Sequence, residues 1–345
     1  MSNFECPLPH QVTDNVLLAH GEGSGMTRQM IRERILPAFS NPVLEQLEDA
    51  ARFTAGDFSL VMTTDSYVVS PLFFPGGDIG SLAVYGTVND LLVSGGEPVC
   101  LTLGMILEEG LPFEILDQIL ASAQRAAKKC GVMIIAGDTK VVPRGDCDQL
   151  YLNTSGVGLA LPERKWSSRA IQPGDELIVT GQIAQHGVAI LTCREQLDFS
   201  PAPQSDSRCV REEIEALTAN QANVRAIRDA TRGGIAAVLQ EWAEASGCTL
   251  TIEAQQIPVS REVSAVCELL GLDPVHIASE GTLMIAVASG TSASIVNSLH
   301  AAGFPYAARV GQARARDLFP VTRINLMGLE QPLEEPLGAP LPRIC

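Results

Sequence analysis

Apolar positions along the chain follow two alternating patterns. Short, nearly continuous apolar runs at 58–64 (FSLVMTT) and 132–137 (VMIIAG) predict buried β-strands. Between them, the apolar positions of 114–131 fall on one side of a helix that should end at Gly131. Strands and helices that alternate in this way favour a layered α/β or α+β architecture.

A second unit of the same kind follows a polar, turn-rich stretch at 161–175. It contains a predicted strand at 176–181, helices at 233–247 and 260–270, and a further strand at 282–288. We therefore expect two α/β domains, which suits a chain of 345 residues. Their predicted bounds are 1–160 and 161–327.

The remaining residues, 328–345, form a proline-rich tail that ends on a cysteine. Pro332, Pro336, Pro340 and Pro342 exclude a helix and a central strand, because proline fixes φ and lacks the backbone donor. The pattern predicts a stiff, extended and mobile arm that carries Cys345. The alternative is a frayed chain end with an incidental thiol.

Charge and cysteine content narrow the classes of partner. The net charge of −16 disfavours nucleic acid and anionic membranes as partners. No apolar run approaches the roughly 20 residues that span a bilayer, and the first residues do not read as a signal peptide. Nine scattered cysteines without a CxxC pair indicate reduced thiols and a cytoplasmic protein.

Two aspartates repeat a short pattern at a predicted strand end. Asp65 begins DSYVV and Asp138 begins DTKVV, and each follows an apolar run. Strand ends are where α/β sheets bind ligands, and Mg²⁺ prefers carboxylate oxygens together with phosphate. The two residues are therefore candidates for a magnesium and phosphate site. The alternative is that each only starts a turn.

Asp90 lies inside a predicted helix that begins after Asp78 and closes at Gly95. At 100° per residue it falls on the same face as Ile79 and Ala83, which is the apolar face. A buried carboxylate needs a partner, so we expect Asp90 either on a metal ion or in a buried salt bridge.

Two glycine-rich stretches precede predicted helices and are candidate phosphate sites. The first contains Gly21, Gly23 and Gly25, and its alternative is a flexible lead-in. The second places Asp229, Thr231, Gly233 and Gly234 at one helix start. Lys140 in GDTKVV and Glu280 in ASEGTL are each also compatible with plain surface charges.

Together these segments resemble a known family. The stretch at 61–80, GTVNDL, AGDTKVV, RDATRGG, SEGTL and the terminal PRIC occur in the order found in the HypE family of hydrogenase expression/formation proteins. The resemblance runs from about residue 18 to the end, and its most specific part is the terminal PRIC.

The resemblance implies a fold and an activity. The family belongs to the PurM-like superfamily of aminoimidazole ribonucleotide synthetase: two-domain α+β proteins that bind ATP and dimerise through the N-terminal domain. Its members carry a carbamoyl group, loaded by the carbamoyltransferase HypF, on the terminal cysteine. They dehydrate this S-carboxamide to an S-thiocyanate with ATP and Mg²⁺. The cyanide then goes to the HypC–HypD complex for the iron of [NiFe]-hydrogenase.

The resemblance also implies residue roles. Asp65, Asp90 and Asp138 would hold the metal. Lys140 and Glu280 would orient the modified Cys345 and move its protons. The residues implied to contact the nucleotide are these three aspartates together with Gly21, Gly23, Ser24, Asp229, Thr231, Gly233 and Gly234. Ser24 departs from the family, which usually has a glycine there, and this puts the contacts of that loop in question.

Two other functions remain open at this stage. One is a related kinase that phosphorylates a small molecule and has no use for a terminal cysteine. The other is a scaffold whose C-terminal peptide docks partners. The four aspartates Asp65, Asp90, Asp138 and Asp229 argue against the scaffold, because a binding module does not require them.

Overall fold

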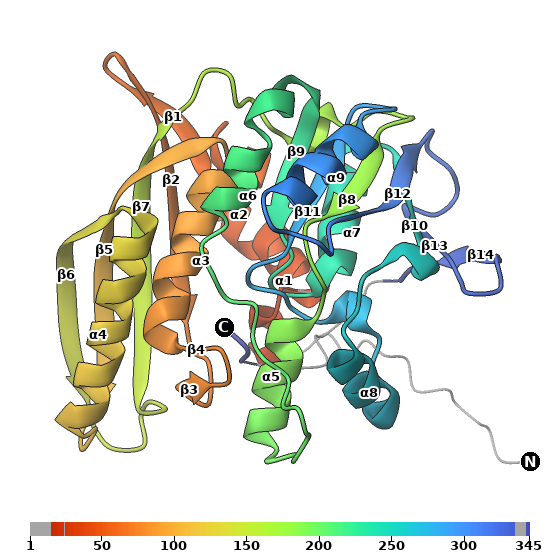
Figure 1. Ribbon diagram of the computed structural model, residues 1–345. Coiled ribbons are helices and arrows are strands. Elements are labelled where there is room, and N and C mark those ends of the chain that lie inside the picture. Colours follow the sequence, from red (N-terminus) through yellow and green to blue (C-terminus); the bar gives the residue numbers. More distant parts are fainter. Residues whose placement is uncertain (1–14, 24, 335–342) are drawn as a thin grey trace, which may run out of the picture.

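The computed structural model describes residues 15–23, 25–334 and 343–345 and contains two mixed sheets, each with helices packed on it (Figure 1). The strands of the first sheet are β1 (Ala51–Ala55), β2 (Phe58–Tyr67), β5 (Gly96–Glu108), β6 (Met133–Val142) and β7 (Leu150–Ala160). Their spatial order is β1-β2-β7-β5-β6, and all neighbours are antiparallel except β5 and β6.

The second sheet has seven strands in the described part of the chain. They are β8 (Glu176–Val179), β9 (Val224–Asp229), β10 (Thr249–Glu253), β11 (Leu283–Val287), β12 (Ala308–Arg314), β13 (Val321–Ile324) and β14 (Glu330–Pro332). Their order is β14-β13-β10-β12-β8-β11-β9, and a small hairpin of β3 (Phe73–Phe74) and β4 (Gly77–Asp78) stands apart. This mixed, mostly antiparallel arrangement confirms the predicted α+β class.

Helices cover the sheets. They are α1 (Gly25–Met30), α2 (Leu36–Phe39), α3 (Ile79–Val93), α4 (Phe113–Cys130), α5 (Gln185–Arg194), α6 (Arg211–Ala216), α7 (Gly234–Ser246), α8 (Arg261–Leu270) and α9 (Ser292–Ala301). Short 3-10 segments lie at Leu18–Gly21, Leu44–Gln46, Ser168–Ala170, Thr218–Asn223, Ala254–Gln256 and Pro274–His276, and a π-helical turn occupies Ile31–Ile35. None of the described helices has the length and apolar character that crossing a membrane requires.

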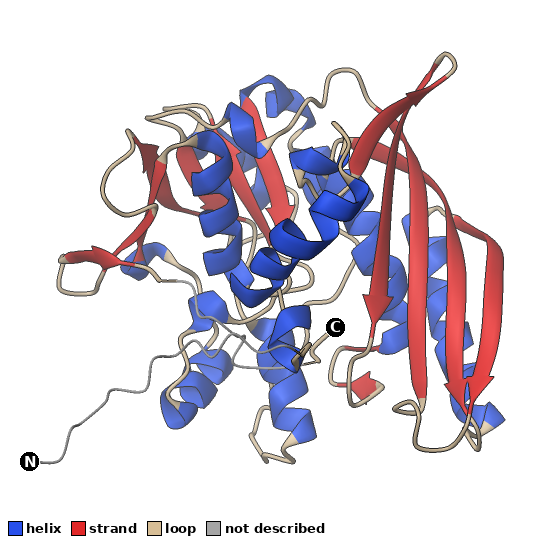
Figure 2. Ribbon diagram, turned by 180° about the vertical axis from the view of Figure 1, so that it is seen from behind, coloured by secondary structure: helices blue, strands red, loops and turns tan. Residues whose placement is uncertain are grey.

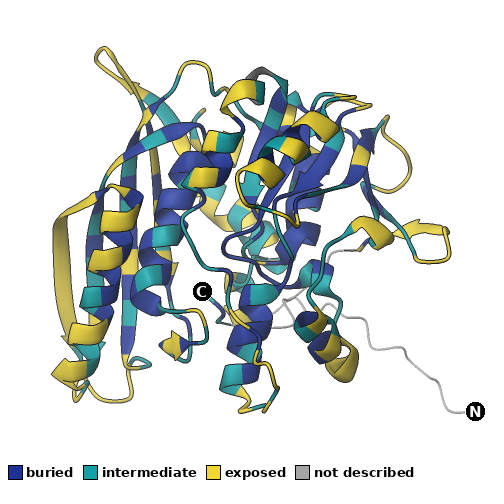
Figure 3. Cartoon of the chain, in the orientation of Figure 1, coloured by how far each residue is buried: buried dark blue, intermediate teal, exposed yellow. Residues whose placement is uncertain are grey.

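Helix α4 forms as predicted. Ile119, Ala123 and Cys130 on its apolar face are buried, and the helix ends at Gly131 with a left-handed φ of 71°. The predicted strand at 132–137 is the start of β6, but the prediction that it is buried is wrong for the single chain. Almost every residue of β6 is exposed (Figure 3). The reason is that β6 is an edge strand of a sheet whose second face is uncovered, as Figure 2 shows.

Helix α3 is buried on more sides than its sequence indicates. Asp78 caps its start by accepting hydrogen bonds from the backbone of Gly80 and Ser81, as expected. The helix packs on the first sheet and on α4, and it also touches β9 and α6 of the second domain. It therefore runs between the two domains, and polar side chains on it can face a site that both domains share.

The described parts of the C-terminal segment are bound to the body of the protein. Residues 330–332 form β14, which adds to the edge of the second sheet with Pro332 opposite Thr322. An edge strand tolerates proline because the missing donor is not needed by a further neighbour. Residues 335–342, on which most of the predicted arm falls, lie outside the described residues. Residues 343–345 are docked between the domains, where Figure 1 marks the C-terminus.

Candidate active site

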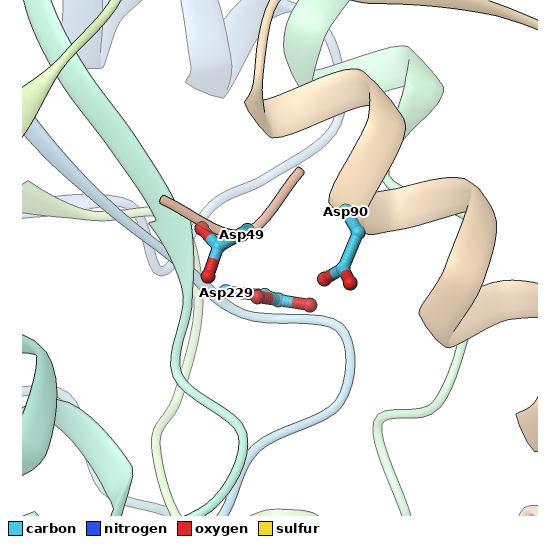
Figure 4. Close-up of side chains that lie close together, drawn as sticks. All are labelled: Asp49, Asp90 and Asp229. Atoms are coloured by element: carbon cyan, nitrogen blue, oxygen red, sulfur yellow. The ribbon is translucent and has the colours of Figure 1, made fainter. Parts of the chain in front are cut away.

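Three carboxylates from separate elements meet where the domains face each other. Asp49 lies just before β1, Asp90 lies on α3, and Asp229 ends β9. One oxygen from each lies within 4.8 Å of the others, and Figure 4 shows the side chains converging. This spacing suits a hard divalent cation that also keeps water and phosphate ligands.

The electrostatics of the cluster favour binding of a cation at its centre. Burial raises the pKa of Asp49 to about 8 and that of Asp229 to about 6, and the neighbouring carboxylates contribute. Burial and Asp65 raise the pKa of Asp90 well above its usual value. Arg228 opposes this for Asp49, with which it forms an ion pair at 2.5 Å. Asp229 Oδ2 is buried and has no hydrogen-bond partner among the described residues. The donor set therefore fits a bound Mg²⁺.

Of the two options for Asp90, the structure supports the metal rather than a salt bridge. Its described partner is the Thr63 hydroxyl, which donates to Oδ2 at 2.8 Å. No ion pair to Asp90 occurs in the described part of the chain. Both neighbouring cluster members are themselves acids.

Asp65 lies beside this cluster and Asp138 does not. Both aspartates are inside strands, β2 and β6, rather than at strand ends as expected. Asp65 faces α3, where the hydroxyls of Tyr67 and Thr87 donate to its Oδ2 at 3.3 and 3.4 Å. Asp65 also lines the same cavity as Asp90 and Asp229.

The strand register places Asp138 on the opposite face of the sheet. Asp138 pairs with Gly104, Gly104 with Asn153, and Asn153 with Ser66, the neighbour of Asp65. Directly paired residues share a face and adjacent residues in one strand do not, so Asp138 and Asp65 point to different sides. Three strand spacings also separate Asp138 from Ser66 by about 14 Å. One chain therefore does not supply Asp138 to the cluster with Asp65 and Asp90, and that expectation is corrected.

Lys140 is likewise exposed on β6. Its ammonium group forms an ion pair with Asp138 at 2.6 Å, and both side chains are mostly exposed to solvent. Lys140 pairs with Ile106 in the same register, so it shares the uncovered face with Asp138.

Two glycine loops close over the carboxylates. A Cβ on Gly23 would lie 2.5 Å from the Cβ of Arg232, and one on Gly233 would lie 2.7 Å from the Cβ of Ala237. Both glycines also have a left-handed φ, so no other residue fits without strain. The loops are joined by Arg232, which donates to the carbonyl of Gly21 at 3.4 Å.

A cavity of about 310 Å³ lies beneath these loops. Among its lining residues are Gly23, Thr231 and Arg232, together with Asp49, Asp65, Asp90 and Asp229. Gly234 starts α7 behind the loop, and a Cβ there would come within 2.6 Å of the Ile277 carbonyl oxygen. Ser24 lies outside the described residues. The cavity thus combines acidic residues on one side with an arginine and loop glycines on the other, which suits a metal-bound polyphosphate.

The terminal Cys345 reaches the edge of this site. Arg232 lines both the cavity above and a second one of about 240 Å³ that is bounded by Cys345, Gly21 and Glu22. Burial raises the pKa of the Cys345 thiol to about 12; Arg232 opposes the shift, while Glu280 and Asp65 add to it. Cys345 therefore lines a cavity that adjoins the acidic one through Arg232.

Glu280 is buried beside them, only 2% exposed. Burial raises the pKa of its carboxyl well above the usual value, and Asp229 and Asp206 contribute. Its backbone is fixed because the NH groups of Glu280 and Gly281 donate to the Asp206 carboxylate at 3.0 and 3.1 Å. A carboxyl held in this way suits proton transfer.

The sequence analysis missed several residues of the site. Asp49 lies in a polar segment with no pattern that distinguishes it from surface charge. Arg228 gave a usable signal, because it is a charge within the strand VRAIRD. Asn89, adjacent to Asp90, is fully buried and donates to the carbonyl of Arg208 at 2.9 Å while accepting from the NH of Val210. It joins α3 to the second domain.

Comparisons with known proteins agree with this architecture. Residues 47–160 match the family model "AIR synthase related protein, N-terminal domain", and residues 172–322 match "AIR synthase related protein, C-terminal domain". The carbamoyl dehydratase HypE of Escherichia coli K12 is 42% identical over 339 residues, which covers 96% of this chain and 100% of the relative.

Solved structures give the same result. The crystal structure of a HypE–HypF complex has a TM-score of 0.84 at 38% identity, and the match covers 89% of this chain and 99% of the solved one. HypE in complex with ATP has a TM-score of 0.79 at 38% identity, over 96% and 100% of the two chains. With these domains and relatives that match almost its whole length, the chain belongs to the carbamoyl dehydratase HypE family of AIR synthase related proteins.

Proposed function

We propose that the protein is an ATP-dependent carbamoyl dehydratase that acts on its own C-terminal cysteine. It converts an S-carboxamide on Cys345 to an S-thiocyanate and so supplies the cyanide ligand of the [NiFe]-hydrogenase iron centre. The observation that carries the proposal is the position of Cys345, which lies against Arg232 at the mouth of a cavity lined by acids and glycine loops. A small-molecule kinase would not need the terminal thiol there.

The residues of the cavity have separate roles in binding the metal and the phosphates. Bound ATP with Mg²⁺ supplies a phosphoryl group that makes the amide oxygen a good leaving group. Asp49, Asp90 and Asp229 hold the metal, with Asp65 beside them. Arg232, Thr231 and the glycines at 21–23 and 233–234 hold the phosphates.

Forming the S-thiocyanate removes both protons from the carboxamide nitrogen and releases the oxygen as inorganic phosphate. Glu280 accepts one of these protons, and the departing phosphate takes the other. The raised pKa makes the ionised carboxylate a stronger proton acceptor than an exposed glutamate. Its surroundings contain the thiol of Cys345 and exclude most water, which protects the product from hydrolysis.

Asp138 and Lys140 act from a second copy of the chain. They share the uncovered face of the first sheet with exposed apolar side chains, among them Phe58, Met62 and Met133. Such a face is suited to a two-fold interface, and packing it against another copy is what brings these charges to a neighbouring site. The homodimer and the roles of Lys140 and Asp138 are parts of this proposal.

The protein acts with two partners, one that loads Cys345 and one that accepts the cyanide. The carbamoyltransferase HypF loads Cys345, as the solved HypE–HypF complex supports. A HypC–HypD complex accepts the cyanide. The cysteines of the described residues are all free thiols, in keeping with a cytoplasmic protein.

Mass spectrometry of the C-terminal peptide tests the activity. Carbamoylated protein incubated with ATP and Mg²⁺ should lose one water molecule from the adduct on Cys345. Cys345→Ala should bind ATP normally and form no thiocyanate, because the cavity residues are unchanged. A cyano adduct on another cysteine, or full turnover by a variant without Cys345, would refute the proposal.

Subunit complementation tests the role of the second copy. Lys140→Ala and Cys345→Ala chains are each expected to be inactive alone. Mixed dimers should recover activity if Lys140 serves its partner's Cys345, because one intact site forms across the interface. If Lys140 acts on the cysteine of its own chain, the mixture stays inactive.

A further inference from the structure

The last three residues bind to the body of the protein alongside residues 68–70. The backbone NH of Val68 donates to the carbonyl of Cys345 at 3.0 Å, and the NH of Ser70 donates to the carbonyl of Arg343 at 3.5 Å. The Arg343 side chain returns two hydrogen bonds to the carbonyl of Val68, at 3.2 and 3.1 Å. Residues 343–345 thus run antiparallel to residues 68–70, and these contacts fix the position of the chain end in the groove between residues 68–70 and helix α5.

Helix α5 also contacts this tripeptide. Near its start, His186 Nε2 lies 2.6 Å from the carbonyl oxygen of Ile344. At its end, Arg194 donates to the carbonyl of Arg343 at 2.6 Å and to that of Ser70 at 2.9 Å. Arg194 therefore contacts both backbone segments, while His186 contacts the carbonyl of Ile344.

The surroundings of His186 determine its protonation. The ring is fully buried, which lowers the pKa of its imidazole and favours the neutral form. A carbonyl oxygen only accepts, so the proton must be on Nε2. Nδ1, 2.8 Å from the Ser205 hydroxyl, is then the acceptor in that contact. The Ser205 hydroxyl thus orients the His186 ring so that Nε2 donates to the Ile344 carbonyl.

Two side chains of the tripeptide are also recognised. Ile344 is 6% exposed and belongs to the main apolar core. The Arg343 guanidinium forms an ion pair with Asp148 at 2.5 Å and stacks over the Tyr151 ring at 5.9 Å. The protein therefore contacts the side chains of Arg343 and Ile344 as well as the backbone of the tripeptide.

We propose that His186 and Arg194 are positioning residues that hold the terminal tripeptide in place, so that the Cys345 thiol lies in the cavity that it lines together with Arg232. Neither residue lines the acidic cavity, and they act on Cys345 only through the carbonyl groups of the two preceding residues. The inference deepens the proposed function, because positioning matters only if Cys345 is the carrier. The docking itself is measurable without any turnover.

The experiment is alkylation of each thiol by N-ethylmaleimide, followed by mass spectrometry of the peptides. The docked Cys345 is half-buried and its thiol has a raised pKa, so release of the tail should speed its alkylation, which requires the thiolate. The test variants are Arg194→Met and His186→Leu, which remove the donors. The conservative variants are Arg194→Lys and His186→Gln, which keep a donor at a similar reach. Arg309→Met is a matched control, because Arg309 is a half-buried arginine that pairs with Glu176 and Glu253, away from the tail.

Removing either donor should raise the Cys345 alkylation rate about tenfold or more, the loss expected for a hydrogen bond from a charged or buried donor. The conservative variants should return most of the protection, and Arg309→Met should match wild type. Cys248, which is 3% exposed and far from the tail in sequence, monitors general loosening in the same sample. A rise at Cys345 without a rise at Cys248 supports positioning; equal rises, or no rise at Cys345, overturn it.

A second measurement separates this inference from the proposed function. In single turnovers of carbamoylated protein, Arg194→Met and His186→Leu should form thiocyanate more slowly, while ATP affinity stays unchanged because the cavity is intact. If a variant shows faster Cys345 alkylation but an unchanged dehydration rate, the positioning role is wrong and the proposed function still stands. Absence of thiocyanate in wild type as well would refute the proposed function and leave the alkylation result standing.

Discussion

Asp90 illustrates how a single buried carboxylate depends on its surroundings. It has a hydroxyl donor in Thr63, two acidic neighbours within 4.8 Å and no described cationic partner. Burying such a group is unfavourable unless a cation binds or the group is protonated. We therefore expect Asp90→Asn to remove a metal ligand and at the same time to relieve the repulsion among three buried carboxylates.

We predict that Asp90→Asn folds normally and loses Mg²⁺-dependent ATP turnover. In buffer without Mg²⁺ its melting temperature should equal or exceed that of wild type, because the amide removes one of three crowded acids. Mg²⁺ with ATP should stabilise wild type and not the variant. A loss of about 3–5 kcal/mol in the free energy of unfolding would instead identify a broken salt bridge.

The Cys345 thiol makes docking of the tail depend on pH. Its pKa rises from 9.0 to about 12 on docking, mainly through burial. The neutral thiol is the docked form, so docking is fully favourable below about pH 9 and weakens as the pH rises from 9 towards 12. At neutral pH the docked sulfur is not a thiolate.

This prediction can be checked by the methyl NMR signal of Ile344, which is buried only when the tail is docked. The signal should move towards that of a solvent-exposed isoleucine between pH 9 and pH 11 in wild type. Cys345→Ala lacks the titrating group and should show no such change. An identical transition in both proteins would assign the effect to another group.

At the scale of elements, α3 and α4 pack closely because Gly80 lacks a side chain. A Cβ on Gly80 would overlap the backbone carbonyl oxygen of Ile119 on α4. The backbone of a helix cannot shift alone, so the two helices would have to separate.

Gly80→Ala should therefore destabilise the protein by about 1–3 kcal/mol in urea unfolding. Gly21→Ala serves as a control with no expected loss, because nothing lies within 4 Å of a Cβ at that position. Equal stability of wild type and Gly80→Ala would show that the α3–α4 contact adapts more easily than its geometry indicates.

The elements also show what the sequence can predict. The period of α4 and its Gly131 cap were sufficient to predict that helix, because both are local features. The exposure of β6 could not be predicted, since an apolar run looks the same whether the strand is covered by the chain or left open at an edge. The family resemblance pointed to Asp90 and Asp229, which the structure brings together in one cluster.

Which acids meet in the site depended on register and packing, which the sequence does not contain. Asp138 and Asp65 are separated because three successive strand pairings place Asp138 on the same face as Ser66, which is the face opposite to that of Asp65. Asp49 enters the cluster because its segment folds back beside β9, with Arg228 between Asp49 and Glu241. No local pattern reports a contact of that kind.

At the scale of the whole molecule, the uncovered face of the first sheet is the main unpaired surface of the N-terminal domain. By register, Phe58, Met62, Ile106, Met133 and Leu159 lie on it and are 40% or more exposed. We predict a dimer of twice the 36.7 kDa chain mass that forms through this face.

The double substitution Met62→Glu with Met133→Glu should give a monomer in light scattering, because like charges would then face each other across the interface. Val141→Glu is a control on the other face of β6, where the side chain is 65% exposed. A monomeric wild type at micromolar concentration, or dimers that persist in the double variant, would exclude this interface.

The pairing of Cys345 with Val68 has a consequence for how the protein is made. These two residues are far apart in the chain, so residues 343–345 are synthesised long after the segment that binds them. Both domains can fold during synthesis, so the groove at 68–70 and helix α5 are in place before the terminal thiol emerges. The catalytic body is therefore complete before its own substrate-bearing residue exists outside the ribosome, and a truncated chain would be a folded protein with an empty groove.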